Sequence, residues 1–188
     1  MSDGVHVDVR GPAMPTHSGR LIYPFDVDPT DVDIDDIAIA LSRINRYLGH
    51  TKYPYSVAQH CVIVSRLVPR WAAWAGLMHD APEAYLGDVI APIKMMLDAR
   101  YKRAEDKAWL AICARYHRNP LMPDQVDYVD KRLRHNEMAA LMILPSCLVD
   151  QARPIRNGEI ESWLRELRPD EAAEEFLGRF RQLEDDHG

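Results

Sequence analysis

Apolar residues recur at helical spacing in segment after segment from Asp33 onward, and this pattern limits the fold more than any other feature. In the first segment the spacing i, i+3, i+4, i+7, i+10 puts five apolar side chains on one helical face: Ile34, Ile37, Ala38, Leu41 and Ile44. Gly49 is a typical C-terminal stop. We therefore expect a helix from about Asp33 to Gly49.

Further segments share this periodicity. Ser56 and Gln59 match a capping box, so we expect a second helix from Ser56 to Pro69. The remaining expected helices cover roughly residues 71–78, 94–117, 126–144 and 169–183. The proline- and glycine-rich residues 1–30 contain one strand-like run, at residues 21–23. The pattern predicts an all-α, bundle-like fold with a short irregular or hairpin N-terminal segment.

Length and composition indicate an ordinary globular protein. The chain has 188 residues, and we expect one domain over residues 1–188 with its core at about 33–144. A net charge of −6 argues against binding a nucleic-acid polymer, which needs clustered cations. No secretory signal is visible, and no apolar stretch approaches the roughly 20 residues that span a bilayer. We expect a cytoplasmic protein with no membrane partner.

Three cysteines, Cys61, Cys113 and Cys147, are too few and too widely spaced for a disulfide framework or a CxxC zinc site. We expect them to be reduced and buried.

His79 and Asp80 are adjacent residues that can both bind a metal. Neighbours on a helix point about 100° apart, so they reach one point only where the backbone turns away. Pro82 provides such a break. The pair therefore predicts a divalent metal site at a helix end.

His60 and Asp130 are candidates for completing this site. Two imidazoles and two carboxylates would balance a divalent ion. A lone buried histidine such as His60 is, however, more often a hydrogen-bonded core residue than a ligand. The residues alone also do not distinguish Asp130 from Asp127.

An ordered set of motifs resembles the HD-domain metal-dependent phosphohydrolases. The matching segments are INRY (44–47), YSVAQH (55–60), HDAPE (79–83), GD (87–88), PIK (92–94) and Asp130. The chain resembles, in particular, prophage-encoded nucleotide hydrolases, bacterial 5'-deoxynucleotidases and phage dATP triphosphohydrolases. The resemblance runs from about Asp33 to Glu137. It implies the HD-domain helical fold, with His60, His79, Asp80 and Asp130 as the metal ligands.

The resemblance also implies roles for two further acids. Glu83 would orient or deprotonate the attacking water, and Asp88 would contact the substrate or the leaving group. Without the resemblance, Glu83 could be an exposed acid in a first helical turn, and Asp88 a turn residue after Gly87.

Substrate contacts are expected from Arg46, Tyr47 and Lys94. The arginine at this motif position binds phosphate in similar enzymes. The next position is commonly tryptophan, which packs on the sugar, so Tyr47 leaves strict deoxyribose selection open. Lys94 is either a further phosphate contact or a solvated lysine at a helix start.

The expected activity is therefore metal-dependent hydrolysis of (deoxy)nucleotides. It would release phosphate from 5'-monophosphates or triphosphate from dNTPs such as dATP. Alternatives are hydrolysis of a signalling nucleotide and an inactive, metal-stabilised binding module. The metal could be Co, Mn, Ni, Zn or Mg, because mixed His and Asp ligation accepts several ions. By resemblance, a homo-oligomer is expected.

Overall fold

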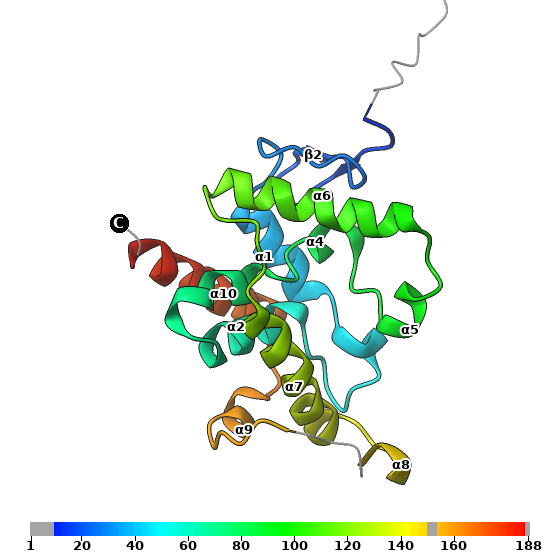
Figure 1. Cartoon of the computed structure of the whole chain (residues 1–188), viewed down its shortest axis with the longest axis vertical. Helices are drawn as coiled ribbons and strands as arrows, with labels where there is room; N and C mark the ends of the chain where they lie inside the picture. The colour runs from blue at the N-terminus through cyan, green and yellow to red at the C-terminus, as the bar shows by residue number, and fades with distance from the viewer. Residues whose placement is uncertain (1–9, 150–153, 187–188) are drawn as a thin grey trace, which may run out of the picture.

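The described part of the chain, residues 10–149 and 154–186, is mostly helical in this computed structural model (Figure 1). In chain order the elements are β1 (Met14–Pro15), β2 (Leu21–Ile22), α1 (Ile34–Arg43), η1 (Arg46–Gly49), α2 (Val57–Leu67), η2 (Arg70–Ala72), α3 (Ala73–Met78), α4 (Glu83–Leu86), α5 (Ala91–Lys94), α6 (Ala99–Arg115), α7 (Asp124–Leu141), α8 (Ser146–Val149), α9 (Ile160–Trp163) and α10 (Pro169–Asp185). The elements η1 and η2 are 3₁₀ turns. The expected helical class and N-terminal hairpin are confirmed.

The hairpin is short and is attached to α1. Strands β1 and β2 pair antiparallel, with Met14 opposite Ile22. Asp36 of α1, which is buried, accepts hydrogen bonds from the hydroxyls of Thr16 and Ser18 and from the Ser18 amide, each at 2.7 Å. One buried carboxylate therefore holds the turn between the strands against the helical core.

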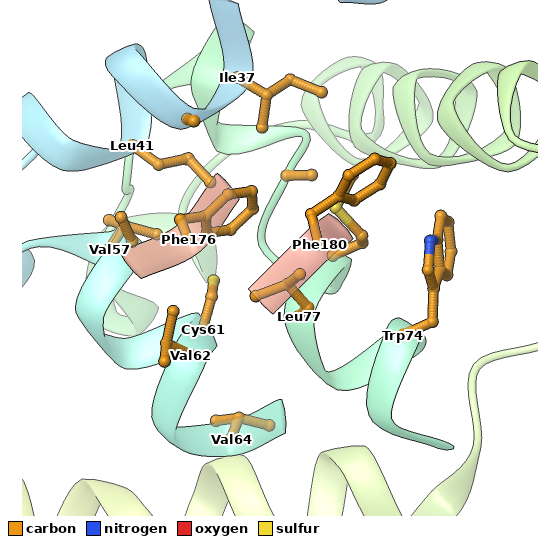
Figure 2. Close-up of a cluster of buried hydrophobic side chains, with 14 of the residues drawn as sticks. Ile37, Leu41, Val57, Cys61, Val62, Val64, Trp74, Leu77, Phe176 and Phe180 are labelled. Carbon is orange, nitrogen blue, oxygen red and sulfur yellow. The ribbon is translucent and has the colours of Figure 1, made fainter. Parts of the chain in front are cut away.

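Helix α10 packs against α1, α2 and α3, running inward from the side of the molecule where the C-terminus lies (Figure 1). Phe176 and Phe180 of this helix are buried among side chains of the other three (Figure 2). Ile37 and Leu41 face them from α1, and Leu77 from α3. Burying aromatic side chains contributes strongly to stability. The C-terminal helix thus completes the core that supports α2 and α3.

Two expected helices end earlier than the periodicity predicted. Helix α1 ends at Arg43, because residues 44–46 leave it to pair with residues 55–57. Helix α7 ends at Leu141 rather than at residue 144, because Lys52 binds its C-terminal carbonyls. The Lys52 amide donates to Leu141 O and its ammonium donates to Ala140 O, each at 2.8 Å. At both helix ends, residues distant in sequence form the hydrogen bonds that backbone groups would otherwise have formed within a longer helix.

The expected helix over residues 94–117 is interrupted. At its start only Lys94 is helical and belongs to α5, while residues 95–98 are not helical. Helix α6 begins after Asp98, whose side chain accepts the Arg100 amide at 2.8 Å. Aspartate is a favoured N-cap residue. Because the apolar spacing continues across Asp98, the periodicity did not indicate that a separate helix begins there. By contrast, the capping box at Ser56 and Gln59 is confirmed.

The cysteines differ from expectation in one respect. Cys61 and Cys113 are buried, but Cys147 is exposed, because it lies on the short peripheral helix α8. All three are free thiols. No helix among the described residues combines the length and apolar character needed to cross a membrane.

Candidate metal centre

His60 enters the centre from the first turns of α2. The capping box at Ser56 fixes where this helix begins, and the chain then turns His60 inward, where it is fully buried. Its Nδ1–H donates to Glu137 Oε1 at 2.7 Å. In the neutral form of the imidazole, which is the form that binds a metal, this bond makes Nε2 the acceptor that faces the centre.

His79 and Asp80 form the sharp corner between α3 and α4. Helix α3 ends at Met78 and α4 begins at Glu83, directly after Pro82. This interruption of the helix brings the two neighbouring side chains together, with His79 Nε2 3.3 Å from Asp80 Oδ2. His79 Nδ1–H donates to the carbonyl of Gly76 at 2.9 Å, which leaves Nε2 as the acceptor.

Asp130, and not Asp127, faces this cluster. Asp130 Oδ1 lies 3.1 Å from His60 Nε2, and its other oxygen is 3.3 Å from the guanidinium of Arg134. Asp127, one turn earlier on α7, is exposed and pairs with Lys131 at 2.6 Å. The two alternatives that the sequence left open are therefore distinguished by which side of α7 packs against α2.

These four side chains present acceptor atoms to a common space. His60 Nε2 lies 3.3 Å from His79 Nε2 and 3.7 Å from Asp80 Oδ2. Ligands at about 2.0 to 2.2 Å from one zinc-like ion would be about 2.8 to 3.6 Å apart. Lone pairs and carboxylates this close repel one another unless a cation lies between them. His60, His79 and Asp130 could therefore hold a metal ion, and Asp80 belongs with His79 and Cys61 to a second, overlapping group that could do so.

Charge at the centre also favours a cation. Burial and Arg46 oppose protonation of His60, but the carboxylates of Glu137 and Asp130 outweigh them and raise its pKa to about 9. Burial likewise opposes ionisation of Asp130, yet the hydrogen bond and charge of His60 hold its pKa well below its usual range. The cluster thus stabilises one positive charge in the space that faces the carboxylates.

A thiol lies beside the same corner. Cys61 Sγ can approach His79 and Asp80 as a third metal-binding atom. Burial and then the charge of Asp80 raise the pKa of this thiol well above its ordinary value. A buried, protonated thiol is a weak ligand compared with the imidazoles.

Glu83 lies just beyond the corner and is buried. Its Oε2 has no hydrogen-bond partner among the described residues, while Oε1 is 3.5 Å from Lys94 Nζ. Burial, followed by the charges of Asp80 and Asp88, raises the pKa of Glu83 to about 10. Its unsatisfied oxygen is available to a further hydrogen-bonding group.

Asp88 lies just after α4, and Lys94 is the last residue of α5. Gly87 adopts φ 79°, a left-handed conformation that favours glycine, and turns the chain so that Asp88 is half-buried. Burial raises the pKa of Asp88. The Lys94 ammonium is 2.8 Å from Glu105 of α6, so in this structure the predicted phosphate contact is already paired.

Arg46 is buried and approaches Asp80 and Glu137, each at 3.4 Å. The hydroxyl of the next residue, Tyr47, donates to Glu137 Oε2 at 2.6 Å. Tyr47 and Leu48 both have left-handed φ angles, 57° and 54°, which are unfavourable for residues other than glycine. Contacts such as the hydrogen bond between Tyr47 and Glu137 therefore hold the backbone of η1 in this unfavourable conformation.

Glu137 is a residue of this site that the sequence reasoning did not select. It is fully buried on α7 and contacts His60, Arg46 and Tyr47. Arg46 and then His60 keep its pKa well below the usual range against the effect of burial. The sequence did contain an indication that Glu137 belongs to the site: it follows Asp130 by seven residues and so lies on the same helical face.

A pocket of about 390 Å3 opens beside the cluster. His79, Asp80 and Glu83 form one wall, and Lys94 and Trp109 belong to the surrounding residues. A small molecule in this pocket would reach the corner residues directly.

Comparisons with known proteins identify relatives. No family model matches the chain. It is 34% identical over 139 residues to the uncharacterized protein RCAP_rcc00048 of Rhodobacter capsulatus, a match that covers 65% of this chain and 70% of that protein. The chain therefore belongs to the family of that protein.

A second relative is the uncharacterized protein YfdR of Escherichia coli strain K12. It is 45% identical over 115 residues, which covers 61% of this chain and 64% of YfdR. The match thus spans slightly less than two thirds of YfdR.

Proposed function

We propose that the chain is an HD-type, metal-dependent phosphohydrolase that acts on (deoxy)nucleotides. The observation that carries the proposal is the buried side chain of Glu83, which has an unsatisfied oxygen and lines a pocket together with His79 and Asp80. A purely structural metal site would need its ligands but not this additional acid. The resemblance of the HD motifs supports the same conclusion.

In this proposal His60, His79, Asp80 and Asp130 hold the ion. When bound, a divalent ion polarises a phosphoryl oxygen and lowers the pKa of water. Glu83 orients the attacking water through the free oxygen. It can also accept the proton of this water once the charge of a bound cation offsets the burial and the charges of Asp80 and Asp88, which raise its pKa to about 10 without one.

Arg46 binds the substrate phosphate and stabilises the charge that develops on it. Its guanidinium lies 3.4 Å from Asp80, so a phosphate bound there also reaches the ion. Asp88 contacts the substrate or leaving group, and Lys94 would have to leave Glu105 before it could bind phosphate. Tyr47 presents its ring to the sugar while its hydroxyl remains on Glu137.

The test is release of phosphate or triphosphate from a panel of nucleoside and deoxynucleoside mono- and triphosphates. Each substrate is incubated with cobalt, manganese, nickel, zinc or magnesium. We expect metal-dependent release from at least one nucleotide, and products separated by chromatography distinguish phosphate from triphosphate. Absence of hydrolysis with every ion would contradict the proposal.

The role of Glu83 is tested by Glu83→Ala. Removing a general base should lower kcat by about 100-fold or more, while metal affinity is retained. Glu174→Ala, an exposed acid of α10, is the matched control and should keep wild-type turnover. Full activity of Glu83→Ala would show that this acid has no part in the reaction.

A further inference from the structure

One buried charge interrupts an apolar face of α7. Leu133 and Leu141, one turn before and one turn after Glu137, are fully buried. Glu137 is equally buried between them, although an apolar side chain would avoid the cost of removing a carboxylate from water. The core alone does not require an acid at this position.

The two oxygens of Glu137 have different partners. Oε1 accepts from His60 Nδ1–H at 2.7 Å and from the Tyr55 hydroxyl at 2.8 Å. Oε2 accepts from the Tyr47 hydroxyl at 2.6 Å and lies 3.4 Å from an Arg46 nitrogen. One oxygen therefore faces the candidate metal ligand, and the other faces the residues expected to bind substrate.

We propose that Glu137 is a positioning residue that links the metal ligand His60 to the phosphate-binding residue Arg46. Because a carboxylate can only accept, Oε1 keeps the proton of neutral His60 on Nδ1 and the lone pair of Nε2 directed at the ion. Oε2 holds the guanidinium of Arg46 between Glu137 and Asp80.

This inference rests on the proposed metal centre for His60 and on the proposed phosphate-binding role for Arg46. It explains why η1 tolerates left-handed φ angles at Tyr47 and Leu48. The hydroxyl of Tyr47 reaches Glu137 from this backbone, so the strained turn also helps to hold the shared carboxylate.

The first test is Glu137→Gln, which keeps the shape of the side chain but replaces one acceptor with a donor. Whichever way the amide turns, either His60 or the Arg46–Tyr47 pair loses its acceptor. With the amide nitrogen toward His60, cobalt affinity should fall about 10- to 100-fold, as is typical when an outer partner of a metal ligand is lost. The visible absorption spectrum of the cobalt protein should change as well.

Tyr55→Phe is the matched control. It removes a buried hydroxyl from the same Oε1 but leaves the carboxylate and its contact with His60. We expect less than a tenfold change in cobalt affinity and an unchanged spectrum. Equal losses in both variants would indicate a general disturbance of the core and would overturn the assignment.

A second measurement uses the wild-type protein and does not depend on how a variant folds. Nitrogen-15 histidine spectra of the zinc-loaded protein should show His60 protonated at Nδ1 and unprotonated at Nε2. A proton on Nε2 of His60 would overturn the inference. So would a Glu137→Gln protein that keeps both its cobalt affinity and spectrum and its affinity for inorganic phosphate, because an amide whose oxygen stays on His60 should instead weaken the hold on Arg46 and Tyr47.

The outcomes separate this inference from the proposed function. A protein that binds cobalt through the Glu137-positioned His60 but hydrolyses no nucleotide contradicts only the function. Active enzyme in which Glu137→Gln leaves both the metal site and the binding of inorganic phosphate unchanged contradicts only the inference.

Discussion

Each side chain of the candidate centre is oriented by a specific partner. The carbonyl of Gly76 and the carboxylate of Glu137 both bind an Nδ1–H, so His79 and His60 turn their Nε2 atoms toward the same space. Neither partner is adjacent in sequence to the histidine it orients. Residue types alone therefore predict which side chains can bind a metal but not which atom they present.

Asp130 should be essential for metal binding, whereas Asp127 should not. Asp130→Asn removes a charged acceptor 3.1 Å from His60 Nε2. Its metal affinity should fall at least by the roughly 10- to 100-fold typical of losing an outer partner. Asp127→Asn, at the exposed pair with Lys131, is the control. Isothermal titration with manganese or cobalt gives the comparison, and equal affinities for the two variants would exclude Asp130 as a ligand.

Asp36 should stabilise the protein in a pH-dependent way. Burial opposes its ionisation, but hydrogen bonds from Ser18 and Thr16 outweigh burial and lower its pKa. Since the folded-state pKa lies below the unfolded value of about 3.9, the stabilisation is complete above that pH. It is lost as the pH falls through the folded-state pKa.

Asp36→Asn should therefore cost about 1 to 3 kcal/mol at pH 7 and less below pH 3. Urea unfolding at both pH values measures this difference. Asp35→Asn, exposed in the same turn, is the control and should cost less than about 1 kcal/mol. A constant penalty for Asp36→Asn at both pH values would contradict the argument.

At the scale of elements, α2 and α3 pack closely; α2 carries His60, and His79 directly follows the end of α3. A Cβ atom on Gly76 would lie 3.0 Å from Val68 Cγ2 and 3.2 Å from the backbone Cα of Ser65. Gly76 thus allows the close approach of these helices, and its carbonyl also orients His79.

Gly76→Ala should destabilise the protein by about 1 to 3 kcal/mol because the added methyl group overpacks the contact. Gly178→Ala, in α10 with open space around its Cβ position, should instead stabilise it by about 0.5 to 1 kcal/mol. Denaturant midpoints followed by circular dichroism compare the two. Stabilisation by both substitutions would mean that α2 and α3 can separate without cost.

Most helices could be predicted from local signals, but several boundaries could not. The capping box of α2 and the proline at the start of α10 act within a few residues. The ends of α1 and α7 depend instead on partners distant in sequence, at residues 55–57 and at Lys52. The N-cap of α6 at Asp98 is also a local signal, but the apolar periodicity across it predicted one continuous helix.

At the scale of the whole molecule, a bound ion would connect three parts of the chain. The candidate ligands come from α2, from the corner between α3 and α4, and from α7. Because these ligands meet only in the folded state, binding should stabilise that state.

Adding cobalt or manganese at about 100 times its dissociation constant should stabilise the protein by about 2.7 kcal/mol. For a chain of this size that corresponds to a rise in melting temperature of about 5 to 10 °C. Thermal melts with the ion and with a chelator measure the shift, and Asp130→Asn should lose most of it. A melting temperature that no divalent ion alters would contradict the proposed metal centre.

The sequence by itself determined the helical class, most helix starts and the sharp corner at His79 and Asp80, a candidate for metal binding. These follow from periodicity, caps and a proline break, which act between near neighbours. Residue types alone left Asp130 and Asp127 open, and the resemblance to the HD-domain enzymes selected Asp130. The tertiary structure decided that Asp130 faces His60 and that Glu137 contacts both His60 and Arg46. Those contacts join residues 70 to 91 positions apart, where the packing of α7 against α2, and not any local pattern, decides which side chains meet.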